Sequence, residues 1–318
     1  MQLQDNADNT WSAWVKDRDD YESIFVKEGR FHAHVHEDVI HAYQTAWYIM
    51  RYAWFHYPMY DEAIKKLTNI VEMAVKLRCE VLEIERQRIN SKGKSIELSL
   101  HELMQQLSRR EPAKQLDYTL SWARNIRNSF AHPSHHCYGG ITSMPTVVPF
   151  INLLNRIFLD NQVAQDDLRH LEQLTGASAV YMNKASVLKW RGLRLLVKSP
   201  VPIGVHHVAV GWLSFWDFQL AFDGACEALS THQYYDEPVL GLLDARFEEE
   251  GLVGTEVGTG TPIQLLLTEH PINLAKLAHH QRELAQVRQE DKSLFEMYRS
   301  SNVLRAYHHF QYAHYWNG

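Results

Sequence analysis

Apolar residues recur at helical spacing through the first half of the chain. Between positions 37 and 57 they follow one another at steps of three or four, as Val39, Tyr43, Trp47, Met50 and Trp54. A longer stripe between positions 60 and 89 contains Ile64, Leu67, Ile70, Val71, Ala74, Val75, Leu77 and Val81. Because an α-helix brings residues three and four apart onto one face, these stripes predict amphipathic helices over 37–57 and 60–89. Pro58 ends the first of them.

Shorter helices are expected beyond these two. Either Ser95 or Ser99 can cap a helix with the sequence "LHELMQQLSRR". Another is expected from about Ala113 to Ala131, and "TVVPFINLLNRIFLDN" returns to helical periodicity. The segments "NSKGKS" and "PSHHCYGGITSMP" are typical of loops. The first half is therefore expected to be nearly all helix.

The pattern changes after about residue 175. "KWRGLRLLVK" and "PIGVHHVAVGWLSF" suit strands, "GLVGTEVGTGTP" suits a turn region, and the last 45 or so residues are again typical of one or two helices. We therefore expect a mainly α fold, with an N-terminal helical bundle followed by an α+β C-terminal domain. The expected divisions are an extension over 1–36, the bundle over 37–160 and the C-terminal domain over 161–318.

Composition narrows the class of protein. Hydrophobic residues make up 45% and charged residues 22% of the 318 positions, as in globular proteins. The most apolar window contains Asp217, so no membrane span is expected, and the polar start of the chain is not typical of a secretory signal. Cys79, Cys137 and Cys226 are scattered, which favours a reducing cytoplasm. The net charge of −6 argues against a globally basic nucleic-acid binder, so an anionic ligand must meet a local basic patch.

The decapeptide "RNIRNSFAHP", residues 124–133, is the strongest candidate for such a patch. On a helix, one arc is apolar and contains Trp122, Ala123, Ile126 and Phe130. The opposite arc is polar, contains no carboxylate, and is made of Ser121, Arg124, Arg127, Asn128 and His132. The residue before a proline is disfavoured in the α region, so Pro133 indicates that the helix ends at His132, where the helix dipole favours a protonated imidazole.

The segment "RNSFAH" resembles the R-x4-H motif of the HEPN superfamily, with Arg127, four residues and then His132. The setting is also similar, because HEPN domains are helical bundles in which a long amphipathic helix precedes the motif helix and another helix closes the bundle. The resemblance covers roughly residues 37–160. It implies a metal-independent ribonuclease that works as a homodimer, in bacterial defence or with an antitoxin or other defence-system partner protein. Other HEPN members have lost catalysis and only bind, so the resemblance is also compatible with a non-catalytic binding module. One subgroup has a tyrosine two places after the histidine, where this chain has Ser134.

The residue types fit RNA cleavage through the 2′-hydroxyl. His132 can act as the base for that hydroxyl, and the guanidinium of Arg127 can stabilise the phosphorane oxygens. Asn128 can orient the histidine or the ribose, and Arg124 can hold a flanking phosphate. This chemistry requires no cofactor and no metal. The alternative is an ordinary solvated helix face in a chain that has 19 histidines.

Other segments offer further candidates. The window 184–198 holds Lys189, Arg191 and Arg194 without an acid, beside Trp190, and either contacts RNA or forms a solvated strand face. His32, His34, His36 and His41 form a cluster that can ligate zinc or can reflect the general enrichment in histidine. His135, His136 and Cys137 follow the motif and are either accessory residues or a polar loop.

The hypothesis that follows is a cytoplasmic endoribonuclease of HEPN type that cleaves RNA without a metal and pools two motifs in a homodimer. The alternative is a non-catalytic scaffold subunit of a defence or toxin–antitoxin complex. In a third hypothesis the C-terminal half has the main activity and the first half only dimerises.

Overall fold

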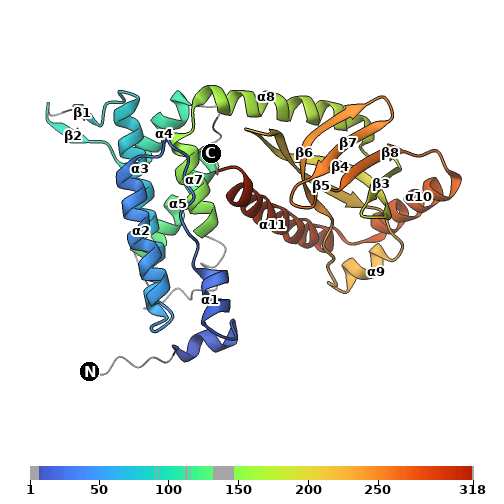
Figure 1. Cartoon of the computed structure of the whole chain (residues 1–318), viewed down its shortest axis with the longest axis horizontal. Coiled ribbons are helices and arrows are strands. Elements are labelled where there is room, and N and C mark those ends of the chain that lie inside the picture. The colour runs from blue at the N-terminus through green and yellow to red at the C-terminus, as the bar shows by residue number, and fades with distance from the viewer. Residues whose placement is uncertain are drawn as a thin grey trace. The chain divides into compact units, whose positions relative to one another are not determined.

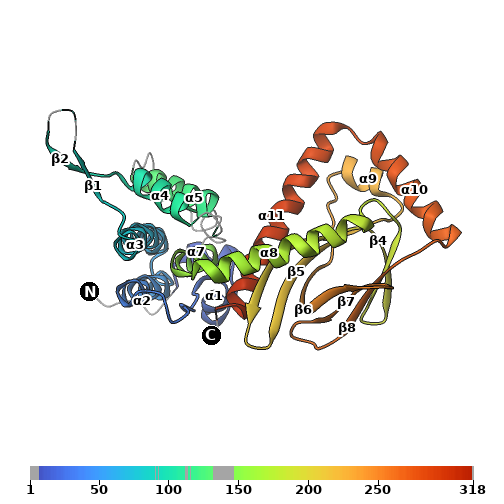
Figure 2. The same ribbon diagram turned by 90° about the horizontal axis from the view of Figure 1, so that it is seen from above.

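The computed structural model describes residues 7–89, 91, 93–111, 114, 116–131 and 147–316. The chain divides into two compact units (Figures 1 and 2). The first comprises Met1–Ala164 together with Gln311–Gly318, and the second comprises Gln165–Phe310. Each unit is described by itself below.

The first unit is built almost entirely from helices. In chain order they are η1 (Asn9–Ala13), α1 (Arg18–Phe25), α2 (Glu37–Tyr52), α3 (Pro58–Val81), α4 (Leu100–Arg110), α5 (Leu116–Ala131) and α7 (Val147–Phe158). A short antiparallel hairpin of β1 (Gln87–Ile89) and β2 (Ser95–Glu97) separates α3 from α4.

Helix α3 is the centre of this unit, because it contacts α2, α4, α5 and α7. Pro58 stands in its first turn, where a missing N–H costs nothing. Its expected apolar stripe is buried from Ile64 to Val75. The stripe ends there, since Val81 is 62% exposed and the helix stops at that residue. The expected helix over 60–89 is therefore correct in its first part and wrong in its last, where residues 87–89 form β1.

Local capping explains where α4 begins. Of the two candidate caps, Ser99 is the one used: its hydroxyl accepts from the backbone N–H of Glu102, and the Glu102 carboxylate accepts from the backbone N–H of Ser99. This reciprocal capping box satisfies two donors that the first helical turn would otherwise leave unbonded. Ser95 lies instead in β2.

The C-terminal segment packs into the first unit through helix α7. Asn152 accepts a 2.6 Å hydrogen bond from the indole of Trp316, whose side chain is buried. The Tyr312 hydroxyl donates to the backbone oxygen of Glu28, and the Arg30 guanidinium lies over the Tyr312 ring. These contacts explain why residues from 311 onward belong to the first unit although they follow the second in sequence.

The second unit is organised around a closed barrel of six antiparallel strands. The strands are β3 (Ser186–Trp190), β4 (Leu193–Val208), β5 (Gly211–Leu220), β6 (Val239–Glu248), β7 (Gly251–Glu256) and β8 (Pro262–Leu267), and β8 pairs with β3 to close the barrel. The other elements are α8 (Asn161–Ser178), η3 (Ala179–Tyr181), α9 (Ala225–Ser230), α10 (Pro271–Gln286) and α11 (Gln289–His314). The unit boundaries at 164/165 and 310/311 fall within α8 and α11.

Side chains fill the barrel, and α11 covers part of its outside. The interior cluster includes Leu188, Val205, Trp216, Phe218, Leu240, Leu242, Leu252 and Leu265. On the outer face, Tyr307 and Phe310 of α11 pack against Leu213 and Phe215 of β5. Figure 1 shows α11 running along the outside of the barrel. This close approach depends on two strand glycines, because a Cβ at Gly204 or Gly241 would stand 2.1 Å from the Tyr307 hydroxyl or the Phe310 ring respectively.

The expectation of a mainly α fold is wrong. The barrel and the β1–β2 hairpin make the chain an α+β protein, and the second half is not a helical bundle. The sequence underestimated the strands because helices cover part of the barrel, so outward positions are apolar as well. In β6, Leu240 and Leu242 point inward while Val239 and Leu243 pack towards the α11 cluster. Strands that are covered on both faces lose the alternation of apolar and polar residues that identifies a strand.

Other expectations can be compared with the structure directly. The expected helical ending is present as α10 and α11. Cys79 and Cys226 are free thiols, and Cys137 lies outside the described residues. Within the described ranges, no helix combines the length and apolarity that crossing a membrane requires.

Gly241→Ala should lower the free energy of unfolding by about 1–3 kcal/mol, because the added methyl group overpacks the contact with Phe310. The control is Gly176→Ala in α8, where nothing lies within 4 Å of the added Cβ. That change should stabilise the protein by roughly 0.5–1 kcal/mol, since glycine is a poor helix former. Urea denaturation measures both, and equal effects in the two variants would contradict the close approach of α11 to β6.

Candidate functional site

The apolar arc of the "RNIRNSFA" helix faces the core, as expected. Helix α5 buries Leu120 and Ala123, and the Trp122 ring lies 4.8 Å from that of Phe150 on α7. Ile126 packs against the same core. These contacts fix the rotation of α5 and turn the opposite, polar arc away from the core.

Arg127 does not stand alone on the polar arc. Its Nη2 atom lies 3.3 Å from the Oε2 atom of Glu72 on α3, and the Arg127 side chain is 39% exposed. Glu72 also pairs with Lys76, at 3.0 Å. An ion pair between partly exposed side chains contributes about 0–1 kcal/mol, so a stronger anion can replace Glu72 at little cost.

The structure describes one of the other two predicted catalytic residues. Asn128 is exposed on α5. His132 lies outside the described residues, as do His135 and His136. The pairing of Arg127 with His132 therefore stays a prediction from the sequence.

Arg124 contacts α4 rather than α3. Its Nη1 atom donates to the Nδ1 atom of His101 at 2.5 Å. A guanidinium can only donate, so the Nδ1 atom of His101 is the acceptor of this bond. The amide nitrogen of Gln105 lies 3.2 Å from the Nε2 atom of the same ring.

A pocket of about 370 Å³ lies along the line where α4 and α5 meet. Both helices contribute to it, and they lie side by side in Figure 2. We call it the seam pocket, and its lining residues are His101, Met104, Gln105, Ser108, Arg109, Asp117, Leu120, Ser121 and Arg124. Among the described residues that the sequence predicted as functional, Arg124 alone lines it. His101, Ser108 and Arg109 had no signal in the sequence, because the pocket forms only when two helices pack.

The basic window of the C-terminal half forms the β3–β4 hairpin. Arg191 stands at the turn with a φ of 49° and donates through Nε and Nη2 to Glu256, at 3.0 and 2.9 Å. Trp190 donates to the same carboxylate. Arg191 therefore has a partner inside the second unit. Lys189 and Arg194 face each other across the hairpin and are exposed.

The histidine cluster near residue 32 serves the local structure. His32 accepts at Nδ1 from the His34 backbone N–H, and its Nε2 donates to the backbone oxygen of Asn155. Burial lowers the pKa of His32. His36 caps α2 by accepting from the backbone N–H of Asp38. In the described part of the chain, no three histidine, cysteine, aspartate or glutamate side chains are grouped so as to hold a metal ion.

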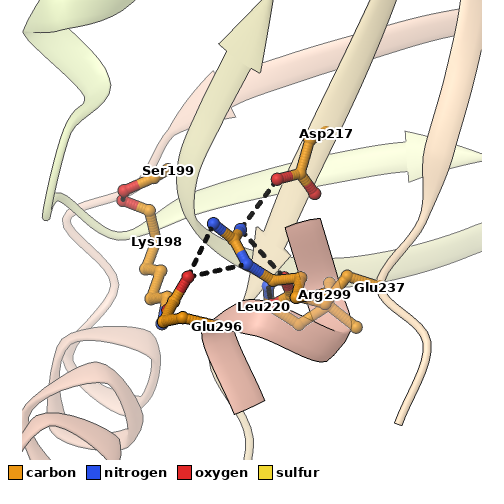
Figure 3. Close-up of polar contacts among 7 residues, drawn as sticks. All are labelled: Lys198, Ser199, Asp217, Leu220, Glu237, Glu296 and Arg299. Carbon is orange, nitrogen blue, oxygen red and sulfur yellow. Dashed lines mark hydrogen bonds and ion pairs between the residues drawn. The ribbon is translucent and has the colours of Figure 1, made fainter. Parts of the chain in front are cut away.

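A second polar site lies against the barrel, around Arg299 of α11. Its guanidinium contacts Asp217 of β5 at 2.7 Å, Glu237 at 3.3 Å and Glu296 at 3.2 Å. Figure 3 shows Asp217 and Glu296 on opposite sides of the guanidinium. The one sequence signal for this site was Asp217, a carboxylate inside the most apolar window of the chain.

Burial shifts the pKa of several groups in this cluster. Desolvation raises the pKa of Asp217 and of Glu237, despite the attraction of Arg299. Desolvation also lowers the pKa of the Lys198 ammonium. The Oδ1 atom of Asp217 is buried and has no hydrogen-bond partner among the described residues, so a charge on this carboxylate is costly. The cluster is therefore best suited to holding α11 on the barrel.

A third polar group joins buried side chains of α8, β4 and α11. His206 lies 3.1 Å from an Asp167 oxygen through Nδ1 and 3.0 Å from the Tyr307 hydroxyl through Nε2. All three side chains are buried. The arrangement links α8, β4 and α11 through buried side chains, so we assign it a structural role.

Comparisons with known proteins found no relative of this chain. The chain matched none of the protein families, curated proteins or solved structures with which it was compared.

The carboxyl of Asp217 should make stability depend on pH. Its folded-state pKa lies above the ordinary value of 3.8, so its contribution is complete below 3.8 and is lost as the pH rises through the raised value. Wild-type protein should therefore lose stability relative to Asp217→Asn as the pH rises from about 4 to 7. Denaturant titrations at several pH values measure this difference. Glu296→Gln is the control, since that side chain is 59% exposed and should show a smaller dependence.

Proposed function

We propose that the protein is a metal-independent endoribonuclease of HEPN type, with Arg127 and His132 as its catalytic pair. The observation on which this rests is the polar arc of α5, which has no carboxylate of its own and follows the R-x4-H pattern. The helix runs to Ala131, so the pattern begins on a regular helix. In this proposal His132 takes the proton of the RNA 2′-hydroxyl, and Arg127 stabilises the charge that develops on the phosphate.

The environment of Arg127 supports the proposal. The guanidinium is partly exposed and paired with a partly exposed glutamate, so it can turn to a phosphate. Arginines with structural roles in this chain are held differently: Arg299, for example, is 17% exposed and contacts buried carboxylates. Asn128, exposed on the same helix, is proposed to orient the histidine or the ribose.

The proposed active enzyme is a homodimer. One R-x4-H arc supplies a single base and few positive charges, whereas two arcs related by a two-fold axis make a composite cleft. Regulation by an antitoxin or a defence-system partner protein belongs to the same proposal, through the HEPN resemblance. A strictly monomeric species that cleaved RNA would contradict the shared cleft.

The second candidate is a non-catalytic binding or scaffold subunit of a defence or toxin–antitoxin complex. In that case the Arg127–Glu72 ion pair would be a structural contact between α5 and α3 rather than a resting state of a catalytic arginine. The two candidates differ in one measurable property, which is cleavage of RNA by the purified protein.

His132→Ala and Arg127→Ala should each lower the rate of RNA cleavage by about 10²–10³-fold, as expected for loss of one transition-state contact. Asn125→Ala is the matched control, since Asn125 is also a polar, exposed residue of α5. Cleavage should survive EDTA, should leave a 2′,3′-cyclic phosphate, and should stop when the cut nucleotide is a deoxyribonucleotide. Gel assays of a labelled oligoribonucleotide measure all of these. Unchanged cleavage in both variants would move the active site elsewhere.

The β3–β4 hairpin is proposed to contribute RNA affinity rather than chemistry. Lys189→Glu with Arg194→Glu should weaken RNA binding and reduce its salt dependence, because two exposed cations on one face of the hairpin are lost. The cleavage rate at saturating RNA should stay the same. Fluorescence anisotropy at several salt concentrations tests this. Arg191 is left intact, since its bond to Glu256 supports the hairpin itself. An unchanged salt slope would mean that the hairpin is an ordinary solvated face.

A further inference from the structure

We propose that the seam pocket between α4 and α5 binds a phosphate group of a nucleotide unit, with the Nε–Nη2 edge of Arg124 as its main donor. The inference deepens the proposed function and rests on it in one respect: the phosphate would belong to the RNA that Arg127 and His132 cleave. The pocket itself is argued below from its own contacts.

The charges lining the pocket favour an anion. Arg109 and Arg124 are full cations, while Asp117 is the only carboxylate among the lining residues. This local positive balance stands out in a chain whose net charge is −6. The hydroxyls of Ser108 and Ser121 and the amide of Gln105 add neutral groups that can donate hydrogen bonds.

The bond to His101 prepares Arg124 for a ligand. It occupies Nη1, so the guanidinium is held in place while its Nε–Nη2 edge makes no hydrogen bond to the described residues. In Arg191 and Arg288 the same edge takes both oxygens of a carboxylate, those of Glu256 and Asp291. Phosphate has the same two-oxygen geometry and is bound by this edge in the same way.

Two donors that line the pocket are buried without a partner. The Nε atom of Arg124 and the hydroxyl of Ser108 have no hydrogen-bond partner in the part of the chain that the structure describes. Leaving a buried donor unbonded is unfavourable, and a ligand oxygen that reaches both atoms removes this penalty. The two atoms come from different helices, so the feature belongs to the seam and not to either helix alone.

The volume of the seam pocket and the position of Arg124 limit which ligands can fit. A volume of about 370 Å³ is near the lower end of ligand pockets, which run from roughly 300 to 1,000 Å³. It suits one nucleotide unit. Arg124 precedes Arg127 by three residues on α5, or about 4.5 Å along the helix axis. A phosphate held by Arg124 would therefore lie beside the one at Arg127.

Binding to the full-length protein tests this without any cleavage. The probes are inorganic phosphate, a nucleoside 5′-monophosphate, the matching nucleoside, and a 2′-O-methyl oligoribonucleotide that cannot be cut. Titration calorimetry should show the oligonucleotide dissociation constant rising about tenfold to a hundredfold in Arg124→Gln, because a charged hydrogen-bond donor is lost. Ser108→Ala should raise it less, and Arg282→Gln, an exposed arginine of α10, should leave it unchanged. Circular dichroism checks that each variant is folded.

The results answer two questions: whether the seam pocket binds phosphate, and whether that phosphate belongs to a free nucleotide or to RNA. Competition by the monophosphate but not by the nucleoside supports a site that accepts a free nucleotide. Binding of the oligonucleotide alone, weakened by Arg124→Gln, supports a site for an internal phosphodiester. Equal affinity in wild type, Arg124→Gln and Ser108→Ala, or no binding of any probe to wild type, overturns the proposal. Phosphate binding without cleavage would reject only the nuclease, and normal cleavage kinetics in Arg124→Gln would reject only the seam pocket.

Discussion

The burial of α3 is the interaction on which the first unit depends. Its apolar residues from Ile64 to Val75 face four other helices, and each fully buried side chain of this kind contributes roughly 1.5–3 kcal/mol. Because α4 and α5 both pack on α3, they also lie against each other, and the seam pocket is the space left between them. The same packing brings Glu72 of α3 to Arg127. The candidate site is therefore a consequence of where one apolar helix had to be buried.

The partners of the arginines distinguish structural from functional roles. Arg78 pairs with the buried Glu111, and Arg191 with Glu256, each through two nitrogen atoms. Such bidentate pairs hold elements together, and breaking a buried one is costly. Arg124 and Arg127 differ, since one is bonded to a histidine ring and the other to a partly exposed glutamate. The Arg127 guanidinium can therefore exchange its partner for a phosphate with little loss of stability, whereas Arg124 can keep its bond to His101 and bind a phosphate through its Nε–Nη2 edge.

Helix α11 combines two kinds of contact with the barrel. Gly204 and Gly241 let Tyr307 and Phe310 lie directly on the strands, which increases apolar contact. Arg299, two to three helical turns earlier, contacts three carboxylates. Burial raises the pKa of Asp217 and of Glu237, so these carboxyls keep their protons to a higher pH than exposed carboxyls do. The apolar contact stabilises the packing of α11 on the barrel, and the charged cluster makes the stability of this packing depend on pH.

The sequence by itself determined the local features of this protein. Helical periodicity located α2, α3, α5 and α7, Ser99 was one of two expected caps, and the rotation of α5 followed from its apolar arc. Tertiary structure alone decided the barrel, because strands covered on both faces lose their alternation, and it alone decided which partner each arginine has. Glu72 and His101 are 55 and 23 positions from the arginines they contact, and no spacing rule reaches that far. Local patterns depend on neighbours a few residues apart, whereas a pocket or an ion pair between elements depends on how those elements pack.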